Sequence, residues 1–377
     1  MSSRTTIEIS ASALRHNIRA VKQHVHPTPV MAVVKANAYG HGAILVARAV
    51  QKDADWFGVD DVDEALALRA AGIRKPILIM GYVRRDRLAM CASKQLSFVA
   101  YNKETLVAIK RLKARKGVFK IHIPIETGTT RQGLFGDELE AFVHEALKIP
   151  SVTIEGICTH YANIEDTTDA SYAMSQLKKY EQALALVKRL GVTSPIRHTA
   201  ASAGALLFPQ VRFDLIRLGI SLYGHWPSKE SKVASSYRST ACVDFRPTLT
   251  WKTIVAQVKR VKKGTPVSYG LTETVSRDSI IAVLPVGYWD GFGRGLSSVG
   301  TVLIKGRRCK VLGRVCMNMT MVDATEVPGI KAEDEIVLIG SQKGESITAE
   351  EVAAKLGTIQ YELLTRINPL IERKIVK

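Results

Sequence analysis

A lysine near the start of the sequence closes a run of small apolar residues, in the segment AVVKANAYGHG (32–42). Burying an ammonium group without a partner is costly, so Lys35 is either a surface residue just past a strand or a functional group. A lysine that is partly desolvated has a lowered pKa and a nucleophilic amine, which suits covalent chemistry on a carbonyl compound. Taken alone, Lys35 leaves both interpretations open.

Polar side chains also stand at the ends of other apolar runs. Arg131 follows one such run in IETGTTRQG, and His160 follows the next in CTHYAN; His198 and Arg217 lie within two more. Each could be a satisfied core or rim residue. If the runs are parallel strands of a barrel, however, their carboxyl ends meet at one face, and these side chains would join Lys35 in one site.

Two small residues suit an anion at the same face. Gly219, in RLGISLYG (217–224), allows backbone N–H groups to approach a ligand closely, and Ser202 could add a hydroxyl donor. The loop after the eighth strand of a barrel is a common phosphate cradle. The segment therefore predicts a phosphate site.

The elements that must position these residues alternate along the first two-thirds of the chain. Short apolar runs, each followed by a long connection, predict eight strands: 30–35, 57–60, 77–80, 98–101, 120–125, 154–158, 196–199 and 215–218. Helices are predicted for 14–25, 61–71 and 177–187 among the connections. The fold class predicted is α/β, a (β/α)₈ TIM-like barrel; a doubly wound sheet is the alternative, and the count of eight favours the barrel.

The alternation of predicted strands and helices ends at about residue 236. The remaining residues predict a mainly β domain with strands at 249–261, 280–284, 301–304, 308–311 and 320–322, and one strong helix at 349–356. The predicted domains are a barrel over 11–235 and a mainly β domain over 236–377. An N-terminal strand, 6–10 within residues 1–10, is expected to join the second domain.

Composition limits the binding partners and the cellular location that can be expected. The 377 residues are 46% hydrophobic and carry a formal net charge of +18. The basic run at 110–116 is interpreted as a solvated helix face rather than a nucleic-acid patch, since no aromatic residues interleave the charges. Five cysteines without CxxC spacing argue against disulfides and zinc, and no segment resembles a signal peptide or a membrane span. We expect a cytoplasmic protein that binds neither nucleic acid nor membrane.

The motifs resemble those of the alanine racemases that depend on pyridoxal 5'-phosphate (PLP), of the barrel-plus-β-domain type known as fold type III. VVKANAYGHG resembles the family's cofactor-lysine segment, and RLGISLYG its phosphate segment. Three further motifs match in order within the second domain: VSYG (267–270), GYWDG (287–291) and GRVCMNM (313–319). The resemblance covers nearly the whole chain.

The resemblance implies racemisation of L- and D-alanine by two bases, Lys35 and Tyr269, in a homodimer whose partner supplies Tyr269 and Met317. Lys35 would carry PLP covalently, and Arg131 with Met317 would bind the substrate. The other cofactor-binding residues implied are Tyr39, His160, Ser202, Arg217, Gly219, Ile220 and Tyr361. D-alanine biosynthesis is the implied role.

Arg217 bears on the type of reaction. Arginine stays charged and offers donors but no acceptor, so opposite the pyridine nitrogen it would keep that nitrogen unprotonated. PLP is then a weaker electron sink, which disfavours transamination and decarboxylation. Tyr361, interpreted as crowding the side-chain pocket, favours alanine over serine.

Three positions depart from the family pattern. Pro124 stands where the family often has a lysine modified to a carbamate, Asn318 where an acidic residue is usual, and Ala201 where asparagine is common. Proline supplies no negative charge, so we expect Arg131 to be oriented by a bound chloride or another anion.

Four alternatives stay open at this stage. A fold-type-III amino-acid decarboxylase would share the lysine and the barrel, but Tyr269 and Cys316 disfavour it. A racemase of serine or of broad specificity, a non-catalytic PLP-binding barrel and a basic nucleic-acid-binding protein are the others. The complete second domain argues against a non-catalytic barrel.

Overall fold

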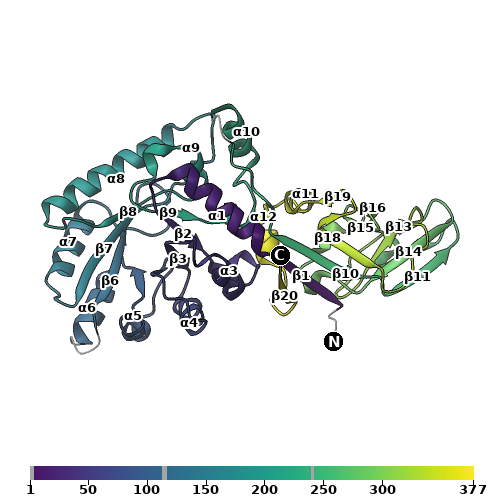
Figure 1. Cartoon of the computed structure of the whole chain (residues 1–377), viewed down its shortest axis with the longest axis horizontal. Coiled ribbons are helices and arrows are strands. Elements are labelled where there is room, and N and C mark those ends of the chain that lie inside the picture. The colour runs from purple at the N-terminus through teal and green to yellow at the C-terminus, as the bar shows by residue number, and fades with distance from the viewer. Residues whose placement is uncertain (1–3, 113–116, 239–241) are drawn as a thin grey trace. The chain divides into compact units, whose positions relative to one another are not determined.

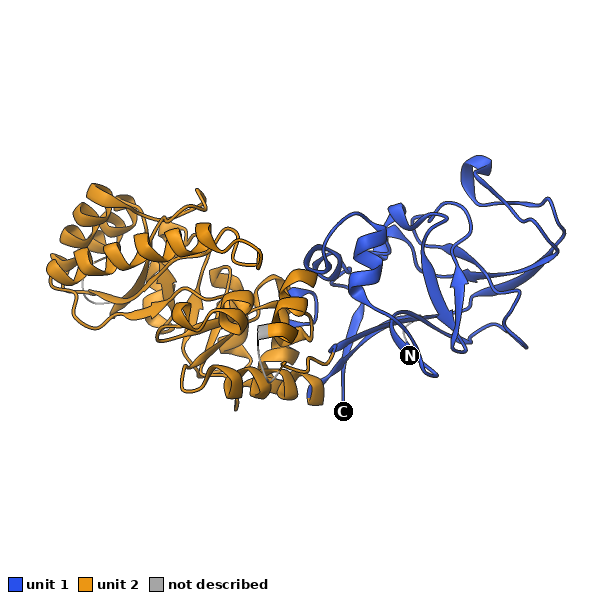
Figure 2. Ribbon diagram, turned by 90° about the horizontal axis from the view of Figure 1, so that it is seen from above, with its two compact units in different colours: residues 1–11, 39–42, 247–377 blue, residues 12–38, 43–246 orange. Residues whose placement is uncertain are grey.

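In a computed structural model, the chain is described over residues 4–112, 117–238 and 242–377. It forms two compact units, shown in orange and blue in Figure 2. The first, called the barrel unit below, comprises residues 12–38 and 43–246; the second, called the β unit, comprises residues 1–11, 39–42 and 247–377. Among the described residues, no helix is long and apolar enough to cross a membrane.

Eight parallel strands form a nearly closed barrel, which confirms the predicted fold class (Figure 1). Neighbours pair in the order β8-β7-β6-β5-β4-β3-β2-β9. Six of these strands are mostly buried, because helices cover one side and packed side chains fill the other; β7 and β8 are buried only toward their carboxyl ends. The strands are β2 (Val30–Val33), β3 (Trp56–Val59), β4 (Ile77–Ile79), β5 (Ser97–Val99), β6 (Phe119–Pro124), β7 (Val152–Cys158), β8 (Ile196–His198) and β9 (Ile216–Leu218).

Helices follow the barrel strands. The apolar stripe of α1, formed by Leu14, Ile18, Val21 and Val25, is at most 1% exposed, as its helical spacing predicts. The helices of this part of the chain are α1 (Ala11–Val25), α3 (Ala43–Val50), α4 (Val62–Ala70), α5 (Leu88–Ser93), α6 (Lys103–Arg111), α7 (Gly136–Leu147), α8 (Ser171–Arg189), α9 (Ser202–Leu207) and α10 (Lys229–Arg238).

The first barrel strand ends earlier than predicted. β2 stops at Val33, and Lys35 opens the five-residue turn α2 (Lys35–Tyr39) instead of closing the strand. The backbone of this turn is left-handed, a conformation that apolar patterning cannot reveal.

The β unit contains three sheets. β1 (Thr5–Ser10) pairs antiparallel with β10 (Leu249–Ile254) and parallel with β20 (Glu372–Val376). The same sheet contains β15 (Thr301–Ile304), β16 (Arg307–Lys310), β18 (Glu335–Gln342) and β19 (Glu345–Ile347). The smaller sheets are β11-β14-β17 (Gln257–Val261, Ser279–Leu284 and Thr320–Asp323) and β12-β13 (Pro266–Val267 and Glu273–Thr274); the helices are α11 (Ala349–Lys355) and α12 (Gln360–Thr365).

The single strand predicted for 249–261 is wrong. The chain leaves one sheet and enters another at Val255 and Ala256, whose amides bond to the carbonyls of Asp334 and Val283. Both halves are apolar enough to look continuous in sequence. The domain boundaries predicted from the sequence, residues 11–235 and 236–377, stay a prediction.

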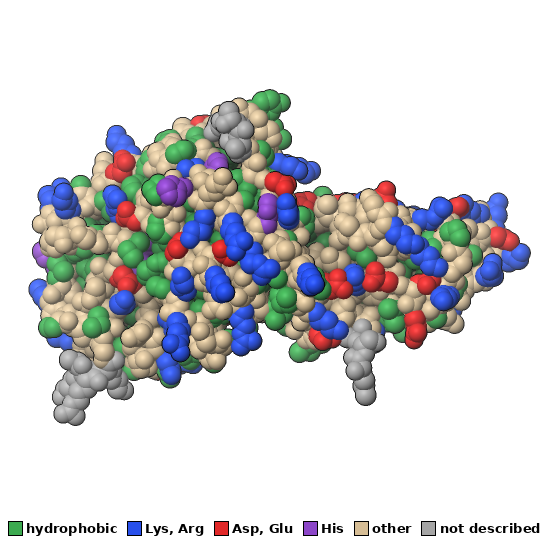
Figure 3. Space-filling model, in the orientation of Figure 1, with side chains coloured by type: hydrophobic (Ala, Val, Ile, Leu, Met, Phe, Trp, Pro, Cys, Tyr) green, Lys and Arg blue, Asp and Glu red, His purple; other side chains and the backbone are tan. Residues whose placement is uncertain are grey.

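The basic run at 110–116 begins at the end of α6, where Thr105, Leu106 and Ile109 are buried. Residues 113–116 of the run lie outside the described residues. On the face drawn in Figure 3, Lys and Arg side chains are spread over the surface with Asp and Glu between many of them.

Candidate active site

The turn that carries Lys35 has an unusual backbone. Ala36, Asn37 and Ala38 all have φ and ψ between +44° and +54°. This left-handed conformation costs roughly 1–2 kcal/mol for each residue with a side chain, so interactions with other residues must stabilise the turn. Glu64 does so: its Oε1 accepts from the amide of Ala36 at 2.6 Å, and its Oε2 accepts from the amide of Asp60 at 2.8 Å.

Lys35 itself reaches a carboxylate. Its Nζ lies 3.1 Å from Oδ1 of Asp60, which directly follows β3. Both side chains are open to solvent, at 40% and 55% exposure. The ion pair is therefore weak and leaves the amine accessible to a reactant.

Arg217 is the buried cation of this site. It projects from β9 and is 7% exposed. Its NH1 donates to Nδ1 and to the carbonyl of His198, at 2.9 and 2.8 Å. Its NH2 donates to the carbonyls of Thr159 and Thr199, each at 2.8 Å. These acceptors fix the guanidinium in one orientation.

One donor of Arg217 stays available. The guanidinium has five N–H groups, of which four serve the acceptors just described. No acceptor for the fifth, Nε–H, is present among the described residues of the barrel unit. A buried arginine with one uncommitted donor suits a ligand atom that accepts a hydrogen bond.

Several positive charges act on His160. Its Nδ1 lies 3.3 Å from NH2 of Arg217. Burial, as the largest cause, and the charges of Arg217, Arg131 and Lys35 together lower the pKa of His160 to about 3. The imidazole is therefore neutral at physiological pH. Lys35, Arg131, His160 and Arg217 thus lie close enough to interact electrostatically, and His198 binds Arg217 directly.

Arg131 is placed by a tight turn after β6. The carboxylate of Glu126 accepts from the amides of Thr129 at 2.8 Å and of Arg131 at 3.3 Å. Burial acts to raise the pKa of Glu126, but these backbone hydrogen bonds outweigh it and lower the pKa. The Arg131 guanidinium forms no ion pair with any described residue of the barrel unit. Pro124, at the end of β6, offers it no charge.

The predicted phosphate residues lie together at the starts of two turns. The amide of Gly219 donates to Oγ of Ser202 at 3.1 Å. Ser202 begins α9 and Ile220 begins a 3₁₀ turn (Ile220–Tyr223), so the first amides of each have no carbonyl within their own helix to bind. Such amides suit a phosphate, and these residues therefore fit the group that the motif implies.

Tyr39 and Tyr361 are neighbours within the β unit. Their ring centroids are 6.1 Å apart and the rings are tilted by 50°. Burial raises the pKa of Tyr39 to about 12, so its hydroxyl stays protonated and can donate. Gly40 makes this packing possible, since a Cβ there would lie 2.1 Å from the carbonyl oxygen of Leu364.

The three second-domain motifs converge elsewhere on the β unit. Oγ of Ser268, next to Tyr269, donates to the carbonyl of Arg314 at 2.6 Å. The amide of Trp289 donates to the carbonyl of Met317 at 3.0 Å. Several large side chains of this surface, called the Tyr269 surface below, are more than half exposed: Tyr269, Leu271, Trp289, Met317 and Met319.

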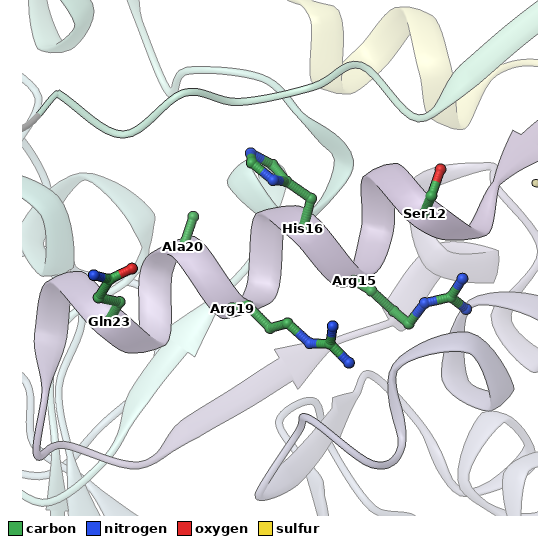
Figure 4. A pocket seen from close by; sticks show the side chains of 6 residues that line it. All are labelled: Ser12, Arg15, His16, Arg19, Ala20 and Gln23. Carbon is green, nitrogen blue, oxygen red and sulfur yellow. The ribbon is translucent and has the colours of Figure 1, made fainter.

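A separate hollow of about 360 Å³ lies along the exposed side of α1 (Figure 4). It is lined by Ser12, Arg15, His16, Arg19, Ala20 and Gln23. None of these is a predicted site residue. His16 and Arg19 are engaged with Asp244 and Asp53, so the hollow offers no reactive group.

Sequence reasoning missed four residues that support the site: Asp60, Glu64, His122 and Glu155. Glu64 lies in the first turn of α4, where an acidic side chain is common and gives no signal of a special role. His122 is a polar residue inside the apolar predicted strand 120–125. This feature of the sequence could have indicated a functional role. Each of the four has at least one partner that is 25 or more residues away in sequence.

The fold and the site define a class: a (β/α)₈-barrel enzyme with a mainly β domain and a basic, lysine-centred site. The family model "Alanine racemase, N-terminal domain" matches residues 9–227, and "Alanine racemase, C-terminal domain" matches 248–375. The chain belongs to the alanine racemase family and is an amino-acid racemase.

Individual relatives agree with this assignment. An alanine racemase of Carboxydothermus hydrogenoformans is 39% identical over 368 residues, covering 97% of this chain and 98% of the relative. One from Leptospira interrogans is 35% identical over 373 residues, covering 98% and 95%. A crystal structure of alanine racemase from Bacillus anthracis with bound L-Ala-P superposes with a TM-score of 0.92 at 32% identity, covering 100% of this chain and 96% of that one.

Proposed function

We propose that this chain interconverts L-alanine and D-alanine with PLP attached to Lys35, using Lys35 and Tyr269 as its two bases. The observation that carries the proposal is the gathering of Lys35, Arg131 and Arg217 around the neutral His160. Bound PLP withdraws electrons from the substrate α-carbon and so makes its proton removable. The roles below belong to the chain's own residues.

The barrel unit would hold the cofactor through donors. Arg217 would give its uncommitted Nε–H to the pyridine nitrogen, because its other donors are already engaged. Neutral His160 would pack on the ring, and Arg131 would donate to the phenolic oxygen. Ser202, Gly219 and Ile220 would bind the phosphate. The family resemblance also implies a phosphate-binding role for the hydroxyls of Tyr39 and Tyr361, which belong to the β unit.

Two bases on opposite faces of the substrate would move the α-proton. One takes it onto Nζ of Lys35 or onto the phenolate oxygen of the tyrosine, and the other returns a proton to the opposite face. Tyr269 is 72% exposed and stands on the surface of its own chain. We propose that Tyr269 of the partner subunit serves this role, so that the active enzyme is a homodimer.

The Tyr269 surface supports the dimer. It contains exposed Leu, Met and Trp side chains, an arrangement that marks protein interfaces. Met317 of the partner subunit would bind the substrate beside Arg131. The five cysteines are unpaired, which agrees with a reducing compartment, and we propose a cytoplasmic enzyme on that ground.

Substrate choice is proposed from Tyr361. Its bulk would favour alanine, but an apolar pocket discriminates against one extra hydroxyl by only about 10²-fold, so slow turnover of serine is expected.

An absorption spectrum tests the proposal. The purified protein should bind PLP, absorb visible light and, after borohydride reduction, carry the label on Lys35 in a peptide map. It should form D-alanine from L-alanine, and no amine from lysine, ornithine or arginine. A Lys35→Ala variant is the control for specific attachment. A colourless protein that takes up no PLP, or an amine product, contradicts the assignment.

A further inference from the structure

A continuous row of polar groups crosses the barrel from Arg217 to a carboxylate on β7. Nδ1 of His198 accepts from NH1 of Arg217 at 2.9 Å. Nε2 of His198 lies 2.8 Å from Nδ1 of His122, and Nε2 of His122 lies 3.2 Å from Oε2 of Glu155. Both imidazoles are at most 1% exposed. The row therefore joins the cofactor-facing arginine to Glu155 without passing through solvent.

The strand geometry is built to place Glu155. Ile121 pairs with Ile154, but the next residue, His122, pairs with Gly156, so Glu155 is the extra residue of a bulge. A bulge re-aims a side chain relative to a regular strand. Gly156 completes the arrangement, because a Cβ there would lie 2.2 Å from Nδ1 of His122.

The donors and acceptors allow one arrangement of protons along the row. Arginine can only donate, so Nδ1 of His198 is unprotonated and Nε2 carries the hydrogen. That hydrogen is donated to Nδ1 of His122, whose own Nε2–H is donated to the carboxylate. Arg217 at one end and Glu155 at the other impose the same arrangement.

Both imidazoles are neutral and the carboxylate is charged. Burial lowers the pKa of His198 well below its ordinary range, and burial likewise lowers the pKa of His122. Burial acts to raise the pKa of Glu155, but hydrogen bonds from His122, Lys120 and Ser97 outweigh it and lower the pKa to about 2. The row thus has one negative and one positive end.

We propose that Glu155 is a positioning residue for the racemase reaction, acting on Arg217 through His122 and His198. Its charge polarises the two imidazoles and makes Nδ1 of His198 a stronger acceptor, which holds the guanidinium in the plane that presents Nε–H to the site. No proton moves along the row, because Arg217 has none to give up at working pH. The kinetic part of this inference rests on the proposed function.

A Glu155→Gln variant tests the proposal, since it keeps the shape and removes the charge. Nitrogen-15 spectra of the histidine rings, measured with and without PLP, report which ring nitrogens carry hydrogen. The native protein should show Nε2–H alone for His122 and His198. In the variant Arg217 still imposes the same arrangement, but the nitrogen-15 shifts of both rings should move because the charge that polarises them is gone. The kcat for alanine should fall about 2- to 30-fold with a smaller change in KM.

Lys120→Gln is the matched control. It removes an exposed partner that lies 2.8 Å from the same carboxylate, and it also changes the charge by one. The histidine pattern and kcat should stay native, because surface ion pairs contribute little.

The two kinds of failure are distinguishable. A native protein that does not racemise alanine refutes the proposed function, while its ring spectra still report the proton arrangement. A Glu155→Gln variant with native ring spectra and native kcat, even one with a lower melting temperature, overturns the positioning role. So does a native protein in which either ring carries its hydrogen on Nδ1.

Discussion

Oε1 of Glu64 lies 2.6 Å from the backbone nitrogen of Ala36, the residue that follows the cofactor lysine of the proposed function. Successive left-handed residues point their amides to one side and form a concave anion-binding site, and here a side chain of the protein fills it. The carboxylate also binds the amide of Asp60, the partner of Lys35. One residue thus holds both the turn and the strand end.

Replacing that carboxylate should loosen the turn. We expect Glu64→Ala to lower the free energy of unfolding by about 1–3 kcal/mol, because the amides of Ala36 and Asp60 lose a charged acceptor. PLP affinity should fall as well, since Lys35 is no longer fixed. Urea unfolding and PLP titration measure the two effects. Asp63→Asn, on the same helix, removes only an exposed ion pair with Arg87 and should match the native protein.

Arg217 should be difficult to replace. Arg217→Lys keeps the charge but cannot serve four acceptors in one plane. One ammonium nitrogen can take the place of NH1 or of NH2 but not of both, so at least two of the four acceptors would lose their donor. We expect a loss of at least about 2 kcal/mol in unfolding free energy together with a large loss of racemase activity. Native stability in urea would show that the hydrogen bonds are dispensable.

Acid should destabilise the fold through His160. The pKa of this group is about 3 in the folded protein, against about 6.5 in the unfolded chain. The unfolded chain therefore binds the proton first, so the stability is fully present above pH 6.5 and is lost as pH falls toward 3. At pH 5 the loss should be about 2 kcal/mol.

His160→Asn measures that contribution directly. The variant should show a smaller decline in unfolding free energy between pH 7 and pH 5 than the native protein. This window lies above the range in which Glu126 and Glu155 take up protons in the unfolded chain, so the carboxylates do not obscure the result. Equal slopes for the two proteins would contradict the assignment of a neutral, partly buried His160.

Tyr269→Phe should abolish most turnover while preserving binding. Removal of a general base typically costs 10²- to 10⁴-fold in rate. We expect this loss in kcat in both directions, with PLP binding unchanged. Tyr237→Phe, at a tyrosine that is 86% exposed on α10, is the control and should be fully active. Full turnover by Tyr269→Phe would rule out the two-base scheme.

Arg131 should bind an anion in place of the charge that Pro124 cannot provide. In a crystal soaked with bromide, anomalous density is expected within hydrogen-bonding distance of the Arg131 guanidinium. Absence of any anion there rejects the hypothesis.

Much of the barrel could be predicted from sequence. Apolar runs bounded by Gly and polar residues located all eight strands to within two residues, because burial on both faces demands continuous apolar sequence. The strands of the mainly β unit were predicted less completely: β10 merged with β11, and five strands were missed, namely β12, β13, β18, β19 and β20. In that unit strand ends depend on partners that are distant in the chain, such as Thr6 opposite Glu372.

By itself the sequence determined the fold class and the motifs that mark the chain as a racemase, since these follow from local residue types and order. Only the tertiary structure decided how they are held. The left-handed turn at Ala36, the carboxylate of Glu64 beneath it, and the row from Arg217 to Glu155 all join residues from different strands and helices. Hydrogen-bond partners are fixed by proximity in three dimensions. The hydrophobic periodicity of a sequence reports only local structure and does not reveal such contacts.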